Sequence, residues 1–223
     1  MSHAKSTFCP GCGQPMTLRA LHQALKKQDL ESKAVLGLDI GCSLLAWDFL
    51  PINTFQTHHG RVVATMNGFK RAKKDSISIA YAGDGGAYAI GLQSLLWAAM
   101  RDEPITVIVS NNVVYAMTGG QSAPTTMIGQ KTSTNLDPVK QEPMRGPELI
   151  KQLNPHAYVA RTSMTDMKEL NHHMEQAIAT QQAGHFSLVE VLSFCPTNWK
   201  VAGPDLKAYV ENMKKIFPVG VCS

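Results

Sequence analysis

Two short polar segments carry the side chains best suited to metal and phosphate chemistry. Asp84 lies among glycines in the segment 83–86, and Asn112 ends the segment 110–112. The 25 residues from 86 to 110 hold one helix-like and one strand-like run, which brings both segments to the carboxyl edge of a parallel sheet. A carboxylate and an amide oxygen are hard ligands of the kind that Mg²⁺ prefers. The spacing therefore predicts a magnesium site there.

The glycines of the first segment favour a diphosphate as the ligand that shares this metal. Gly83 and Gly85 have no side chain, so their backbone can approach a ligand closely. The helix expected to begin near Gly86 would direct its free N–H groups at an anion.

The cysteines form a second group of reactive side chains. Cys9 and Cys12 make a Cys-x-x-Cys pair, which has three interpretations: a redox dithiol, half of a zinc site or half of an iron–sulfur site. No strand fits before Cys9, which disfavours a redox fold, and either metal site needs about two more soft ligands. Cys42 and Cys195 both follow strand-like runs, so both can reach the ligand edge. Cys222, beside the C-terminus, is interpreted as a bystander.

The elements that must position these groups alternate between strands and helices. Apolar runs predict strands at 34–38, 76–82, 105–109, 157–160 and 186–191. Three- and four-residue spacing predicts helices at 16–27, 62–73, 87–100 and 167–182. We therefore expect an α/β fold with a mostly parallel sheet and helices on both faces. A polar loop around 130–147 is expected to serve the site, and the tail from about 195 to 223 is expected to be irregular.

The composition fits one globular domain spanning residues 1–223. Hydrophobic residues make up 44% of the chain and charged residues 17%, and the formal charge of +4 is too small to indicate a nucleic-acid partner. No apolar stretch reaches the roughly 18–20 residues of a membrane span, and the first residues contain no signal-peptide core. We expect a cytoplasmic protein without a membrane partner, in which cysteines are reduced and free to bind metals.

The glycine and asparagine segments resemble the thiamine diphosphate motif of transketolase-like and decarboxylase-like enzymes. That resemblance implies that Asp84, Asn112 and the backbone carbonyl of Val114 hold Mg²⁺. It also implies the thiamine diphosphate-binding, or pyrophosphate-domain, fold.

A more specific resemblance is to the β subunit of the 2-oxoacid:ferredoxin oxidoreductases. The motifs that carry it are, in chain order, 8–13, 39–43, 59–61, 115–121, 124–126 and 195–199. It implies that Cys9, Cys12, Cys42 and Cys195 bind one [4Fe–4S] cluster beside the cofactor. The cofactor-binding positions that it implies are Cys42, Ser43, His59, Gly83, Asp84, Gly85, Gly86, Asn112, Val114, Met117 and Thr118. Of the other histidines, His58 is interpreted as a bystander, and His172 and His173, on an amphipathic helix, are expected to be solvated.

The family resemblance also implies a reaction and partners. The reaction converts a 2-oxoacid, coenzyme A and oxidised ferredoxin into acyl-CoA, CO₂ and reduced ferredoxin. No catalytic residue is assigned in this chain, because the glutamate that activates the cofactor is expected in an α subunit. That subunit, with γ and δ subunits as further candidates, would also supply the electron route to ferredoxin.

The choice of 2-oxoacid rests on an apolar stretch after Cys42. Leu44, Leu45, Ala46 and Trp47 include no lysine or arginine that could pair with a second carboxylate. An apolar pocket suits pyruvate or a branched-chain 2-oxoacid, and the motifs at 115–121 and 195–199 look most like the 2-oxoisovalerate and pyruvate branch. Simple core packing of 44–47 is the alternative.

Two other functions compete with this one. A non-oxidative thiamine diphosphate decarboxylase subunit would explain Asp84 and Asn112 but would leave four cysteines without a role. A zinc-bound interaction domain without catalysis would explain Cys9 and Cys12 but not the aspartate and asparagine.

Overall fold

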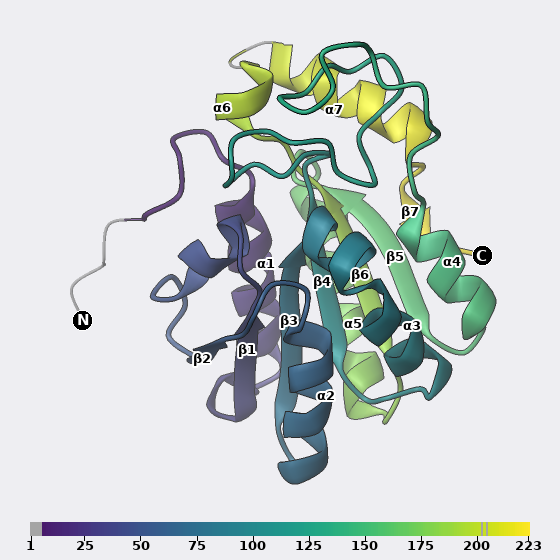
Figure 1. Cartoon of the computed structure of the whole chain (residues 1–223). Helices are drawn as coiled ribbons and strands as arrows, with labels where there is room; N and C mark the ends of the chain where they lie inside the picture. The colour runs from purple at the N-terminus through teal and green to yellow at the C-terminus, as the bar shows by residue number, and fades with distance from the viewer. Residues whose placement is uncertain (1–5, 202, 204) are drawn as a thin grey trace.

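The fold is built on a seven-stranded sheet whose order is β2-β1-β3-β4-β6-β5-β7 (Figure 1). The computed structural model describes residues 6–201, 203 and 205–223. The strands are β1 Ala34–Leu38, β2 Asn53–Gln56, β3 Ile77–Gly83, β4 Thr106–Asn111, β5 Tyr158–Ser163, β6 Ser187–Leu192 and β7 Gly220–Val221. All neighbours run parallel except β7, which pairs antiparallel with β5. The prediction of a mostly parallel sheet is confirmed.

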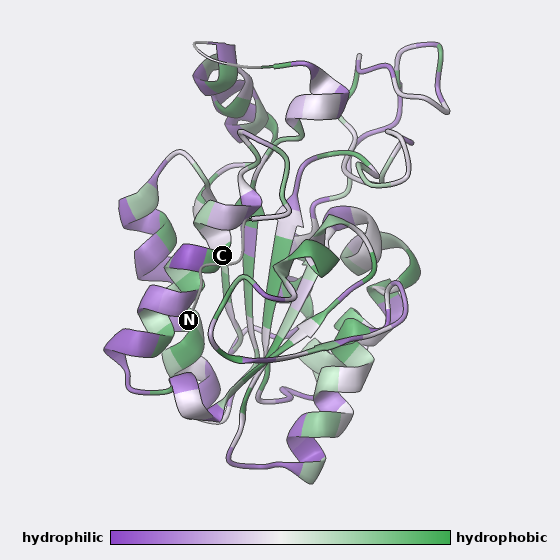
Figure 2. Ribbon diagram, turned by 90° about the vertical axis from the view of Figure 1, so that its left-hand side faces the viewer, coloured by the Kyte–Doolittle hydropathy of each residue, from purple (hydrophilic) through white to green (hydrophobic). Residues whose placement is uncertain are grey.

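Helices cover both faces of this sheet, also as predicted. Helices α1 (Gln14–Lys27) and α5 (Met167–Gln182) pack against each other on one face. Helices α2 (Val62–Ala72), α3 (Leu92–Met100) and α4 (Gly146–Leu153) cover the other. Each face has its own apolar core, and Figure 2 shows hydrophobic colour concentrated in the strands between the helix layers.

The burial of the central strands explains their sequences. Every residue of β4 is buried, as is every residue of β3 except Gly83. A parallel strand covered on both faces is mostly apolar along its length instead of alternating with polar residues. The continuous runs in the sequence are therefore diagnostic of this sheet. Asp166 is the N-cap of helix α5, and its side chain accepts a hydrogen bond of 3.1 Å from the backbone N–H of Glu169.

The order of the strands creates the crevice where a ligand can bind. The chain passes from β1 outward to β2 and then returns to the opposite side of β1 to form β3. The connections after β1 and β3 therefore leave the sheet in different directions and open a space at its carboxyl edge. Gly83 of β3 pairs in register with Ser110 of β4, so the two predicted polar segments are neighbours.

The prediction of an irregular tail at 195–223 is wrong. The segment contains α6 (Pro196–Trp199), α7 (Asp205–Ile216) and β7. Val210 and Met213 of α7 are fully buried, and Met213 packs with Phe217 in a third apolar cluster. Their spacing is helical, with an acidic residue in the first turn and lysines in the last, so the signal was present in the sequence.

Three further elements differ from the sequence expectation. The helix expected at 87–100 begins as a π-helical turn, Gly86–Ile90 (η3), before α3. Strand β2 and helix α4 were not expected at all. Among the described residues, no helix combines the length and apolar character needed to cross a bilayer.

The expectation that His173 is solvated is also wrong. His173 is only 3% exposed, and its Nδ1 lies 2.7 Å from the hydroxyl of Tyr158. Burial and the neighbouring His172 lower the pKa of His173. His172 is exposed, as expected, and His58 is also exposed.

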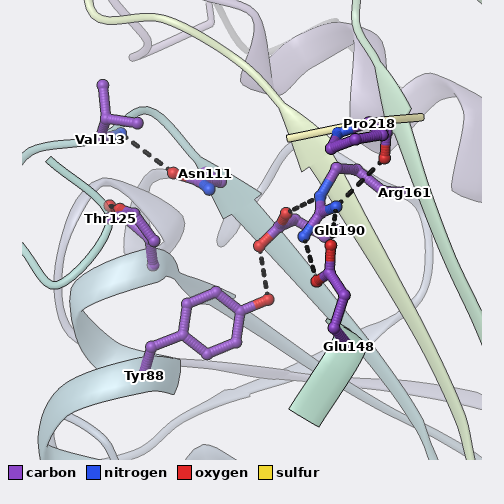
Figure 3. A network of polar contacts seen from close by, with 9 residues as sticks. Tyr88, Asn111, Val113, Thr125, Glu148, Arg161, Glu190 and Pro218 are labelled. Atoms are coloured by element: carbon purple, nitrogen blue, oxygen red, sulfur yellow. Dashed lines mark hydrogen bonds and ion pairs between the residues drawn. The ribbon is translucent and has the colours of Figure 1, made fainter. Parts of the chain in front are cut away.

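A buried ion network joins the elements behind the crevice (Figure 3). The guanidinium of Arg161 on β5 donates to Glu190 on β6 and forms two bonds of 2.7 Å to the carboxylate of Glu148 on α4. Arg161 also donates to the carbonyl of Pro218, at 3.1 Å, and Tyr88 of η3 donates to Glu190, at 2.6 Å. The network thus fastens the sheet, α4, the C-terminal segment and the π-helical turn together.

Replacing Arg161 with Met is expected to lower the free energy of unfolding by about 3–5 kcal/mol. Arg161 is 0% exposed, and its loss would leave the buried carboxylate of Glu190 without a cation. Arg19→Met, at an exposed position on α1, is the matched control and should change stability by less than about 0.5 kcal/mol. Urea denaturation followed by circular dichroism measures both. Equal stabilities for the two variants would show that the network contributes nothing.

Candidate functional site

A cavity of about 270 Å³ lies at the carboxyl edge of β1, β3 and β4. All eleven residues expected to bind the cofactor contribute to its walls. They are Cys42, Ser43, His59, Gly83, Asp84, Gly85, Gly86, Asn112, Val114, Met117 and Thr118. Residues at or after the ends of four different strands, up to 76 positions apart in the chain, therefore meet in one place, as the sheet topology requires.

Asp84 is a buried carboxylate without a cationic partner among the described side chains. It is 2% exposed, and the hydroxyl of Thr125 donates a hydrogen bond to its Oδ2. Burial raises the pKa of Asp84 to about 7, against the lowering effect of that hydrogen bond. An ionised carboxylate in such a position needs a compensating charge. A divalent cation fits this requirement.

The segment after β4 presents oxygen atoms from a strained turn. Val113 has a φ of 57°, which a β-branched residue rarely adopts, and it is fully buried. Two bonds hold the turn: Thr126 donates to the carbonyl of Val113 at 2.8 Å, and the indole of Trp199 donates to the carbonyl of Asn112 at 2.9 Å. The side chain of Asn112 accepts from the backbone N–H of Val114 at 3.3 Å. The strain is thus maintained where the predicted metal ligands lie.

Two glycines of the turn 83–86 lie where a side chain would not fit. A Cβ on Gly85 would come within 2.1 Å of the ring of Tyr115, and one on Gly86 within 2.0 Å of the carboxylate of Asp39. The backbone here therefore lies close to the cavity wall, as a diphosphate cradle requires. The π-helical turn that follows is a rare element found most often at functional sites.

The protonation of His59 follows from its neighbours. Its Nδ1 lies 2.8 Å from the carbonyl of Ile40 and 3.1 Å from Oδ2 of Asp39, and both of these atoms are acceptors. Nδ1 therefore carries a proton, and the other ring nitrogen is left for the cavity. Asp39 is 0% exposed and also accepts from the backbone N–H of Gly60 at 2.6 Å, so its position is fixed. Burial raises the pKa of Asp39, while His59 lowers it.

Four cysteines gather beside the cavity. Burial raises the pKa of Cys42 to about 12, and the thiols of Cys12, Cys195 and Cys9 each add to the rise. Burial likewise raises the pKa of Cys12, with smaller contributions from Cys9 and Cys195. These mutual effects place the four thiols within electrostatic reach of one another, and all four are free. Cys222 lies instead near Arg161 and Glu148, consistent with a bystander.

The cysteine group has the chemistry of a cluster site. Among the residues that the structure describes, no three His, Cys, Asp or Glu side chains converge closely enough to hold a single metal ion. A [4Fe–4S] cluster makes a different demand, because four thiolates bind the cluster as a whole and not one ion. The four neighbouring thiols satisfy that demand in residue type and number.

The apolar stretch 44–47 is placed differently from the expectation. None of its residues contributes to the walls of the 270 Å³ cavity. Leu45 and Ala46 pack in the core beneath α1, and Trp47 is half exposed beside a separate hollow. For Leu45 and Ala46 the core-packing alternative is therefore correct.

Several residues of the site have no role assigned from the sequence, although Asp39, Tyr115, Thr125 and Trp199 belong to the motifs that carry the family resemblance. Asp39, Thr125 and Trp199 support His59, Asp84 and Asn112 respectively, and Gln14 and Tyr115 line the cavity. Asp39 directly follows β1 at the same sheet edge, which is the same signal that identifies Asp84. Thr125 lies in the irregular segment between β4 and α4, which loops over the carboxyl ends of the strands (Figure 1).

Comparison with known proteins gives a consistent family. Residues 39–191 match the family model described as the thiamine pyrophosphate enzyme C-terminal TPP binding domain. The chain is 34% identical over 221 residues to ketoisovalerate oxidoreductase subunit VorA of Methanothermobacter thermautotrophicus, covering 95% of this chain and 46% of the relative. It is 34% identical over 210 residues to 2-oxoglutarate synthase subunit KorB of Archaeoglobus fulgidus, covering 93% of this chain and 77% of that one.

Two further matches agree. The 2-oxoacid:ferredoxin oxidoreductase subunit beta of Saccharolobus solfataricus is 33% identical over 201 residues, covering 85% of this chain and 62% of the relative. The solved 2-oxoglutarate:ferredoxin oxidoreductase from Magnetococcus marinus matches with a TM-score of 0.84 and 23% identity, over 99% of this chain and 81% of that chain, which shows the shared fold. The chain spans about half the length of the two VorA relatives that it matches.

Proposed function

We propose that this chain, which belongs to the family of thiamine pyrophosphate-binding subunits of 2-oxoacid:ferredoxin oxidoreductases, holds thiamine diphosphate, Mg²⁺ and one [4Fe–4S] cluster. Together with partner subunits it would convert a 2-oxoacid and coenzyme A into acyl-CoA and CO₂ while reducing ferredoxin. The observation that carries the proposal is that the eleven expected cofactor residues line one cavity, and that Cys42 belongs both to this cavity and to the cysteine group.

Mg²⁺ would be held by Asp84, Asn112 and the carbonyl of Val114. Oxygen ligands and a shared diphosphate suit this ion, and the buried carboxylate of Asp84 would gain the counter-charge that it otherwise lacks. The diphosphate would lie against the turn at Gly85 and Gly86, two positions of the cavity wall that carry no side chain of their own. When bound, thiamine diphosphate supplies the electron sink that decarboxylation of a 2-oxoacid needs.

His59 would meet the cofactor with a defined tautomer. Asp39 and the carbonyl of Ile40 keep a proton on Nδ1, so the ring turns Nε2 towards the cavity. The carboxylate of Asp39 thus fixes the tautomer and the orientation of the His59 ring, in addition to lining the cavity itself.

Replacing Asp39 with Asn is expected to weaken the binding of thiamine diphosphate about tenfold. The amide would place a donor or a weaker, neutral acceptor against Nδ1, so the ring of His59 would lose the partner that fixes its tautomer and orientation. Asp75→Asn, at an exposed position, is the matched control. Calorimetric titration of the cofactor-free complex measures both affinities. An affinity of Asp39→Asn equal to that of the control would show that Asp39 does not contribute to cofactor binding.

The cluster would be held by Cys9, Cys12, Cys42 and Cys195. Cys42 lies between the cofactor cavity and the other thiols, which provides a short path for electrons. The relatives are named as subunits of oxidoreductases or of a 2-oxoglutarate synthase. These names favour neither of the two competing functions, the non-oxidative decarboxylase subunit and the zinc-bound interaction domain.

The partners follow from what the cavity lacks. Among the described residues that line it, Asp39 and Asp84 are the only carboxylates, and both are engaged in the roles above. The glutamate that activates the cofactor is therefore assigned to an α subunit, which would also complete the cavity. Ferredoxin, coenzyme A and a 2-oxoacid are the further partners, γ and δ subunits are additional candidates, and the cytoplasm is the expected compartment.

The substrate class follows from the walls of the cavity. Its described lining includes no lysine or arginine that could pair with a second carboxylate, and it includes the apolar side chains of Ile40, Val114 and Met117. A 2-oxoacid with an apolar side chain, such as pyruvate or 2-oxoisovalerate, fits this lining better than 2-oxoglutarate does.

Ferredoxin reduction by the purified complex tests the function and the substrate class together. We expect coenzyme A-dependent reduction with either apolar 2-oxoacid, and a kcat/KM at least about tenfold higher for 2-oxoisovalerate than for 2-oxoglutarate. The chain purified alone should show no turnover. Turnover by the isolated chain would refute the assignment of the glutamate to a partner, and a preference for 2-oxoglutarate would refute the substrate class.

A further inference from the structure

Helix α6 connects the cysteine group to the cofactor cavity. The thiol of Cys195, at its N-terminus, accepts two hydrogen bonds from Asn198: one from the backbone N–H at 3.4 Å and one from the side-chain amide at 3.2 Å. The hydroxyl of Thr197 lies 3.8 Å from the thiol of Cys9. Two of the four proposed cluster ligands therefore accept hydrogen bonds from this helix.

The same amide of Asn198 reaches the cofactor side. Its Nδ2 donates to the carbonyl of Ala116 at 3.1 Å, directly before Met117 and Thr118 in the cavity wall. Gly120 fits closely under it, since a Cβ there would lie 2.7 Å from Oδ1 of Asn198. One side-chain amide thus holds a cluster ligand and a wall of the cofactor cavity at the same time.

We propose that Asn198 is a positioning residue that raises the reduction potential of the cluster bound through Cys195 and fixes that cluster against the cofactor wall at Ala116. The inference rests on the proposed function, because it requires a cluster on the four cysteines. It concerns a residue that is neither a ligand nor in contact with the 2-oxoacid.

The physical reason is the charge of the sulfur. A thiolate bound to iron carries more negative charge when the cluster is reduced, so an N–H donor at the sulfur stabilises the reduced form more than the oxidised form. Removing the side-chain donor while keeping the backbone donor should therefore make the cluster harder to reduce. The second bond, to Ala116, keeps the amide aimed at Cys195.

Asn198→Leu in the intact complex tests this inference, because leucine has a similar size and no donor. We expect the equilibrium constant for one-electron reduction of this cluster to fall about tenfold, which is about 59 mV towards more negative potential. Redox titration followed by electron paramagnetic resonance measures it. Asn198→Ser, which keeps a shorter donor, should fall between wild type and Asn198→Leu, and Asn212→Leu, on the exposed face of α7, should leave the potential unchanged.

The outcomes separate this inference from the proposed function. A cluster at full iron content with an unchanged potential in Asn198→Leu overturns the inference and leaves the proposed function intact. A wild-type chain without a cluster overturns both. If Asn198→Leu does not retain its iron, the potential of Asn198→Ser decides: a negative shift supports the role of Asn198, and a wild-type value contradicts it.

Discussion

Asp84→Ala is expected to weaken the binding of thiamine diphosphate by at least about 100-fold and to abolish 2-oxoacid-dependent turnover. The variant removes the only carboxylate among the proposed Mg²⁺ ligands, and the diphosphate would lose the cation that bridges it to the protein. The hydroxyl of Thr125 would also lose its acceptor. Calorimetric titration with Mg²⁺ and thiamine diphosphate measures the loss directly.

Asp84→Asn is the sharper companion, because it preserves size and removes only charge. Without metal, the buried carboxylate is uncompensated, so the Asn variant should be at least as stable as wild type. On addition of Mg²⁺ and thiamine diphosphate, the melting temperature should rise for wild type and not for Asp84→Asn. An equal rise in both proteins would contradict the assignment of Asp84 as a metal ligand.

Cys12→Ser is expected to remove the cluster and to lower the rate of ferredoxin reduction by at least about 100-fold. Binding of thiamine diphosphate should remain intact. Serine is a hard ligand and a poor replacement for a thiolate on iron. Because Cys12 does not line the cofactor cavity, thiamine diphosphate affinity should stay within about twofold of wild type. Iron analysis and cofactor titration on the same sample separate the two effects.

Cys222→Ser is the matched control for this variant. Cys222 is a partly buried free thiol on the far side of the sheet, close to Arg161 and Glu148. The iron content and the turnover of the Cys222→Ser complex should equal those of wild type. If both serine variants lose iron, or if neither does, the cluster is not held by the four cysteines.

Strand burial and topology made part of the site predictable. Asp84 and Asn112 directly follow strands that are buried along almost their whole length, and parallel strands end at a common edge. Any polar residue directly after such a strand is therefore close to the others. This is why Asp84, the glycines beside it and Asn112 could be assigned to one site from the pattern, whereas the family resemblance alone implied Ser43, His59, Val114, Met117 and Thr118.

The features that were missed depend on contacts between distant segments. Val113 has a left-handed backbone, which β-branched residues such as valine disfavour. This conformation persists because Trp199 donates to the carbonyl of Asn112 and Thr126 donates to the carbonyl of Val113. His173 lies on the packed face of α5, where Tyr158 of β5 satisfies it, and no local pattern encodes that partner. Helix α7 is different, since its apolar spacing was readable in the sequence.

The central claim is that one chain holds thiamine diphosphate and a [4Fe–4S] cluster side by side. The most direct measurement is iron, sulfide, zinc and thiamine diphosphate per complex, prepared anaerobically with wild-type chain and with Cys42→Ser. We expect thiamine diphosphate in the wild-type complex, and about four fewer irons and four fewer sulfides in the variant, because clusters in partner subunits cancel in the difference. Equal iron in both complexes, or zinc in place of iron, would contradict it.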